Sequence, residues 1–122
     1  MAISEAEAIV MEVLWHQAPR SAEEILAEVG PRQAWQEGTV KSLLNRLLKK
    51  KAVKAEREGR RYLYTPLLSR EKYVSQESKG LLDRLFGGRV APLVAHFSEQ
   101  HKLSRKDVAE LRRLLEELDD ER

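Results

Sequence analysis

Hydrophobic residues recur at helical spacing in three short segments of the N-terminal half. The first two segments each follow a capping-box pattern, in which Ser4 or Ser21 stands three residues before a glutamate. The apolar residues behind Ser4 predict a first helix that ends near His16, and those behind Ser21 predict a second, shorter helix. The pair Gly30-Pro31 predicts the end of that second helix.

The third segment predicts a helix with one apolar and one polar face. A polar link over residues 32–37 precedes it, and Thr39 is in position to cap its first turn. The inward positions are apolar: Val40, Leu43, Leu44, Leu47 and Leu48. The positions on the opposite rows point outward and are polar or basic: Lys41, Ser42, Asn45, Arg46 and Lys49.

Residues 52–66 have the pattern of a β-hairpin. Tyr62 and Tyr64 stand two residues apart, which is the same-face spacing of a strand, and Gly59 supplies the positive φ that a tight turn requires. Three compact helices followed by a two-stranded hairpin are the element order of a winged helix-turn-helix. The predicted fold class is therefore mainly α, with a winged helix-turn-helix N-terminal domain over residues 1–67.

Residues 68–122 predict further helices whose apolar stripes are surplus to the core of a winged helix. Stripes of that size rarely stay exposed on a monomer. We therefore expect a helical dimerisation arm, in which each subunit covers the apolar faces of the other. The residues expected at this homodimer interface are Leu81, Leu82, Leu85, Phe86, Leu93, Val94, Phe97, Leu111, Leu114, Leu115 and Leu118.

Positive charge is concentrated between Gly38 and Tyr64. That stretch holds nine lysines and arginines but only two acids, whereas the whole chain has a net charge of +2. A polyanion is the partner expected for such a cluster. Arginine and lysine reach guanine edges or phosphates, and asparagine can pair with adenine, so the third helix has the residue types of a recognition helix. The candidate DNA-binding residues are Thr39, Lys41, Ser42, Asn45, Arg46, Lys49, Lys54, Arg60 and Arg61.

Each of these features also has an ordinary structural interpretation. The polar face of the third helix could be a solvated surface, and Arg57, Arg60 and Arg61 could protect an exposed strand edge. Lys49, Lys50 and Lys51 stand near the C-terminus of that helix, where the negative end of the helix dipole stabilises positive charge in any case. Winged helices can bind partner proteins, so the alternative function is a protein-interaction module without DNA readout.

An enzyme is not expected, nor is a cofactor or a metal. The chain has no cysteine, which excludes disulfides, thiolate metal sites and cysteine nucleophiles. No nucleophile elbow, phosphate-binding glycine loop or cluster of carboxylates with metal spacing occurs. A metal-dependent hydrolase would have to rest on His16, His96 and His101, for which a surface position is the simpler interpretation.

The composition predicts a folded cytoplasmic protein. Hydrophobic residues make up 42% and charged residues 34% of the chain, which is within the globular range. No stretch approaches the roughly 18 uninterrupted apolar residues of a membrane helix. The first residues are acidic where a secretory signal would be basic.

Three strings carry a resemblance to a known family: TVKSLLNRL, EGRRYLY and the glycine pair after LDRLF. In this order they resemble the penicillinase and methicillin-resistance repressors, the BlaI/MecI/CopY type, and the similarity extends over nearly the whole chain. The resemblance implies a homodimeric repressor that binds an inverted-repeat operator. It also implies DNA contacts from the third helix (Thr39, Lys41, Ser42, Asn45 and Arg46) and from the hairpin (Arg60 and Arg61).

The resemblance has a further implication for release from DNA. Some repressors of this type control antibiotic resistance and respond to β-lactams. In these repressors, a membrane receptor with metalloprotease activity leads to cleavage of the dimer arm at an Asn-Phe bond. The matching pair here is His96-Phe97, which keeps the phenylalanine but not the asparagine. The copper-responsive branch carries a cysteine motif that this chain lacks, which excludes copper sensing through thiolates.

Overall fold

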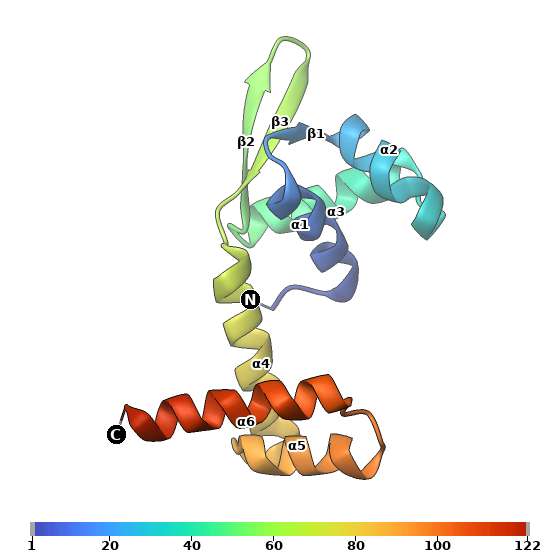
Figure 1. Ribbon diagram of the computed structural model, residues 1–122. Coiled ribbons are helices and arrows are strands. Elements are labelled where there is room, and N and C mark those ends of the chain that lie inside the picture. The colour runs from blue at the N-terminus through green and yellow to red at the C-terminus, as the bar shows by residue number, and fades with distance from the viewer. Residues whose placement is uncertain (1, 122) are drawn as a thin grey trace. The chain divides into compact units, whose positions relative to one another are not determined.

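The computed structural model describes residues 2–121, which form two compact units divided between Ser75 and Gln76. The first unit holds three helices and a small sheet (Figure 1). Its elements in chain order are α1 (Glu5–His16), β1 (Arg20–Ser21), α2 (Ala22–Gln33), α3 (Glu37–Lys49), β2 (Val53–Glu58) and β3 (Arg61–Pro66). This order confirms the predicted winged helix-turn-helix.

Both predicted capping boxes form. At the start of α1, the Glu7 backbone N–H donates to Ser4 Oγ at 3.1 Å, and the Ser4 N–H donates to Glu7 Oε1 at 2.8 Å. Ser21 and Glu24 repeat the arrangement at the start of α2. These bonds satisfy backbone donors that would otherwise lack partners in the first turn, so the two helices begin where the sequence predicts.

The boundary between α2 and α3 differs from the prediction. The pair Gly30-Pro31 predicted the end of α2, but the helix continues through Pro31 to Gln33. The C-cap residue Ala34 stops the helix, because its backbone is in the left-handed region with φ 57°, and the Trp35 N–H donates to Gly30 O at 3.0 Å.

The prediction that Thr39 caps α3 is also wrong. The helix begins at Glu37 after the N-cap residue Gln36, which makes no side-chain capping bond. Thr39 already lies in the first turn, where its N–H donates to Gln36 O at 3.1 Å. The recognition-helix candidate is therefore about one turn longer at its N-terminal end than predicted, and it includes Glu37.

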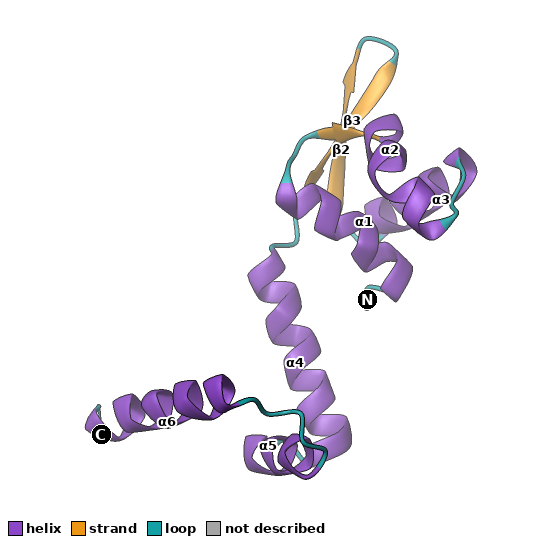
Figure 2. Cartoon of the chain, turned by 45° about the vertical axis from the view of Figure 1, so that its right-hand side comes forward, coloured by secondary structure: helices purple, strands orange, loops and turns teal. Residues whose placement is uncertain are grey.

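The sheet is antiparallel with the strand order β1-β3-β2. Strands β2 and β3 form a hairpin with Glu58 opposite Arg61, and its tip projects beyond the helices (Figure 2). Gly59 has φ +63°, which confirms the positive φ predicted for the turn. The two-residue strand β1 was not predicted, because it is defined only by its pairing with β3.

The core of the first unit lies between the three helices and the sheet. Each helix contributes its apolar face, and β2 and β3 cover the remaining side of the core. Its fully buried side chains include Val10, Met11, Leu14, Ile25, Val29, Val40, Leu44, Leu47 and Val53. The carboxylate of Glu7 is also buried there, and Lys50 Nζ donates to its Oε1 at 2.5 Å.

The helix α4 (Arg70–Phe86) begins in the first unit, and the second unit continues with α5 (Val90–Glu99) and α6 (Arg105–Asp120). No residue of these three helices is buried in the single chain. Several large apolar side chains are more than half exposed, among them Leu85, Leu115 and Leu118. No helix within residues 2–121 combines the length and apolarity needed to cross a membrane.

Candidate nucleic-acid interface

The helix α3 separates its residues into a buried and an exposed face. Val40, Leu43, Leu44 and Leu47 are buried in the core. The opposite side of the helix faces solvent. All six candidate residues of α3 are exposed there: Thr39, Lys41, Ser42, Asn45, Arg46 and Lys49.

The hairpin presents the other candidate cations. Lys54 on β2, Arg60 in the turn and Arg61 at the start of β3 are all exposed. Two of them are held by nearby acids. Lys54 Nζ lies 3.0 Å from a carboxylate oxygen of Glu56. An Arg61 guanidinium nitrogen lies 3.4 Å from a carboxylate oxygen of Glu58. Arg61 also lies 3.8 Å from a carboxylate oxygen of Glu24. All three cations are therefore exposed, but within residues 2–121 only Arg60 makes no ion pair.

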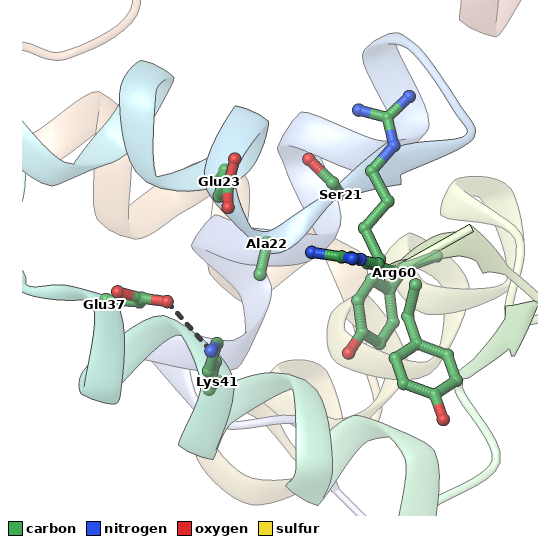
Figure 3. A pocket seen from close by; sticks show the side chains of 9 residues that line it. Ser21, Ala22, Glu23, Glu37, Lys41 and Arg60 are labelled. Carbon is green, nitrogen blue, oxygen red and sulfur yellow. Dashed lines mark ion pairs between the residues drawn. The ribbon is translucent and has the colours of Figure 1, made fainter. Parts of the chain in front are cut away.

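A hollow of about 140 Å³ brings the recognition-helix candidate and the hairpin together. It lies where the start of α2 meets α3 and β3. Lys41 lines it from α3, Arg60 and Arg61 line it from the hairpin, and the N-cap Ser21 and Tyr64 complete the lining. Figure 3 shows Lys41, Arg60 and Ser21 around this hollow. Three predicted residues from distant parts of the sequence thus share one surface.

A second hollow, of about 420 Å³, lies along another side of α3. Its lining includes three further candidates, Thr39, Ser42 and Arg46. Asn45, Lys49 and Lys54 line neither hollow. Three of the nine predicted residues therefore line the first hollow, between α3 and the hairpin, and three line the second hollow along α3. The other three lie outside both hollows.

Acidic residues that were not predicted as part of the site lie among the cations. Lys41 Nζ lies 2.8 Å from Glu37 Oε1, and both side chains are more than half exposed. Their hydrogen bond lowers the pKa of Glu37 and raises the pKa of Lys41. The charge of Glu23 on α2 further raises the pKa of Lys41. The four-residue spacing of Glu37 and Lys41 is the signal that could have predicted this pair.

Tyr64 forms part of the floor of the first hollow. It is 9% exposed, and burial is the main cause that raises the pKa of its hydroxyl. The tyrosine therefore stays neutral at physiological pH and supports the hollow by packing. Nowhere among residues 2–121 do three histidine or acidic side chains gather as metal ligands would.

The first unit has three helices followed by a hairpin, and the third helix presents an exposed basic face. These features define the class of winged helix-turn-helix proteins. Residues 3–117 match the sequence pattern of the penicillinase repressor family, and the chain belongs to that family. It is 34% identical over 115 residues to the penicillinase repressor of Bacillus licheniformis, a match that covers 94% of this chain and 90% of that protein. The family consists of transcriptional regulators that are not enzymes.

Two solved structures show the same fold in the first unit. The solution structure of the DNA-binding domain of the repressor BlaI matches with a TM-score of 0.54 and 35% identity, over 58% of this chain and 87% of that one. The Bacillus licheniformis BlaI monomer in complex with the blaP half-operator matches with a TM-score of 0.53 and 34% identity, over 60% and 89%.

Proposed function

We propose that the chain is a sequence-specific DNA-binding repressor that acts in the cytoplasm as a homodimer on an inverted-repeat operator. The observation that carries this proposal is the exposed face of α3, where polar and basic side chains alternate with the buried core positions. A helix of this kind fits the major groove of B-DNA. The similar BlaI domain in complex with a half-operator supports the proposal.

The candidate residues divide by the part of DNA that they suit. Arg46 and Asn45 can read base edges, since arginine pairs with guanine and asparagine with adenine. The hairpin cations Arg60 and Arg61 suit phosphates or the minor groove. Phosphate contacts fix the register and supply salt-dependent affinity, whereas the base contacts supply the sequence preference.

The homodimer is proposed from the apolar surface of the second unit. The predicted interface residues are exposed or only half-buried in the single chain, and Leu114, Leu115 and Leu118 on α6 are at least half exposed. Between α5 and α6 lies an apolar hollow of about 270 Å³, lined in part by Val94 and Phe97. A second copy of the chain would remove these surfaces from water.

Loss of the dimer is the proposed mechanism of release. One winged domain neutralises few phosphates, whereas two linked domains gain by effective concentration. We infer that the signal is a β-lactam relayed by a membrane metalloprotease system, with the bond His96-Phe97 as the candidate cleavage site. That bond lies inside α5, where the Gln100 N–H donates to His96 O at 3.1 Å. A protease would have to unwind this end of α5 to reach it.

Selection of bound sequences from a random pool of duplex DNA tests the proposal. We expect enrichment of an inverted repeat whose half-sites lie about 10 base pairs apart, or a multiple of that spacing. Affinity for the selected sequence should fall steeply between low and moderate salt. If no sequence is enriched and the chain binds no DNA at any salt concentration, the protein-interaction module is the better function.

A further inference from the structure

The basic residues of the candidate interface differ in whether a carboxylate already holds them. Lys41 is paired with Glu37 at 2.8 Å. Arg46, Lys49 and Arg60, in contrast, make no ion pair with any residue between 2 and 121. On the hairpin, Lys54 and Arg61 are also paired with acids. Among the candidate cations of α3, Lys41 is therefore the one that must leave a partner before it can bind DNA.

The Glu37–Lys41 pair has a favourable geometry on the helix. Glu37 is the first residue of α3, where the helix dipole stabilises a carboxylate, and an acid four residues before a lysine is the better orientation of such a pair. The dashed line in Figure 3 joins the two side chains, and both residues line the first hollow. Glu23 adds a second negative charge near Lys41 from α2.

We propose that Glu37 is a specificity-determining residue, which withholds Lys41 from DNA phosphates and releases it only at the correct base pairs. This inference rests on the proposed function, since it assigns a role within the DNA-binding face. Glu37 also lies at the N-terminal end of α3, the end at which a recognition helix contacts base edges.

On unrelated DNA the pair should stay intact. Non-specific binding depends almost entirely on contacts between cations and phosphates. A phosphate that approaches Lys41 must compete with the Glu37 carboxylate at 2.8 Å and is repelled by it, and Glu23 adds to the repulsion. Lys41 is thereby removed from the set of cations that bind any duplex.

At the operator the pair can be exchanged for base contacts. The ammonium group of Lys41 suits the O6 and N7 acceptors of guanine, and the carboxylate of Glu37 can accept from the amino group of cytosine. Both charges then keep a partner when the pair opens. Only a base sequence that offers an acceptor and a donor in the right places compensates for its loss, so the pair increases discrimination rather than overall affinity.

The variant Glu37→Gln tests the inference, because it keeps the shape of the side chain but removes its charge. Affinity for an unrelated duplex should rise roughly fivefold to tenfold at 0.1 M salt, with a salt slope about 0.9 more negative, as expected for one freed cation. Affinity for the selected operator should rise less, so the ratio of the two affinities should fall. Fluorescence anisotropy across a salt series with both duplexes measures these quantities.

Two further variants show whether the effect comes from this pair. Asp83→Asn makes the same change of net charge at another exposed pair of the same spacing, Lys79–Asp83 at 3.3 Å, and should leave the affinity ratio near that of the wild type. The double variant Glu37→Gln, Lys41→Gln should lose the added non-specific affinity. An Asp83→Asn effect as large as that of Glu37→Gln, or a double variant that keeps the gain, would overturn the inference.

The wild-type chain in the same series separates this inference from the proposed function. A wild type that does not prefer the selected operator contradicts the proposed function and the inference with it. A wild-type preference that Glu37→Gln leaves unchanged contradicts the inference alone.

Discussion

Individual side chains on α3 have different proposed roles in DNA binding although they share one exposed face. Arg46 has no ion pair within residues 2–121 and lines the second hollow, so it is free to reach a base edge. Lys41 is restrained by Glu37. A count of charges does not distinguish a cation that is ion-paired with an acid, such as Lys41, from one that is not, such as Arg46. That distinction depends on which helix row each residue occupies and on which acid stands one turn away.

Arg46→Ala should weaken binding to the selected operator by about 1–3 kcal/mol and relax the preference for one base, because a bidentate contact to guanine is lost. Anisotropy with the operator and with duplexes altered at single positions measures both effects. Arg113→Ala, on the polar face of α6, is the control and should change neither. An unchanged footprint and affinity for Arg46→Ala would exclude a base-reading role.

Glu7 stabilises the fold through its buried pair with Lys50. Burial raises the pKa of Glu7, but hydrogen bonds from Lys50 and Ser4 outweigh burial and leave the pKa below its ordinary value. A lowered pKa in the folded state means that the unfolded chain binds more protons in this range, so the contribution to stability is present above about pH 4.3 and is lost at lower pH.

Glu7→Gln should therefore lower the free energy of unfolding by about 1–3 kcal/mol at neutral pH, since it leaves the Lys50 ammonium without its carboxylate. The difference from the wild type should shrink as the pH falls below about 4. Urea unfolding at several pH values measures it, and Glu12→Gln, which breaks the exposed pair with Arg70, should have a much smaller effect. A difference that stays constant from pH 7 to pH 3 would contradict this role.

At the scale of elements, the sequence predicted what is determined locally. Ser4 and Ser21 begin their helices because capping depends on residues within one turn, and Gly59 makes the hairpin turn because its φ is positive. The strand β1 was missed because it exists only through pairing with β3, more than 40 residues away in the sequence. Pro31 misled the prediction because the bonds around Ala34, rather than the proline, end α2.

The same limit applies to the candidate interface. The helical period predicted which residues of α3 point outward, and all of them are exposed. The period could not show that Lys41 and Arg60 line one hollow, because that depends on how the hairpin packs beside α2 and α3. The ion pair of Glu37 with Lys41 was not predicted either, because the predicted start of α3 placed Glu37 in the link before the helix.

The apolar face of α6 is the element on which the proposed dimer depends most. Leu111→Glu combined with Leu115→Glu should yield monomers that hold the operator poorly, since charges on this face cannot be buried against a second copy. Sedimentation equilibrium measures the mass of the species in solution. Arg113→Glu makes the same change of net charge on the polar face and should stay dimeric. A double variant that still sediments as a dimer would show that another surface forms the interface.

In the whole molecule, the second unit is the part proposed to pair two copies of the first unit, each carrying one α3. The first unit has its own core and capped helices, so we expect it to keep its fold if the proposed dimer separates. Affinity is then controlled by how many first units one DNA duplex engages, and no change in the structure of α3 is required. Damage to the second unit should weaken binding to the full operator far more than binding to a single half-site.

The most direct test of this account places a DNA-cleaving chelate on α3. Because the chain has no cysteine, Ser42→Cys gives a single attachment point on the exposed face of the helix for an iron chelate that cuts nearby DNA. On the selected operator we expect two clusters of cuts, related by the two-fold axis of the sequence and about one helical turn of DNA apart, or a multiple of it. A single cluster, or cuts scattered evenly along the duplex, would contradict the claim that two copies of α3 read one inverted repeat.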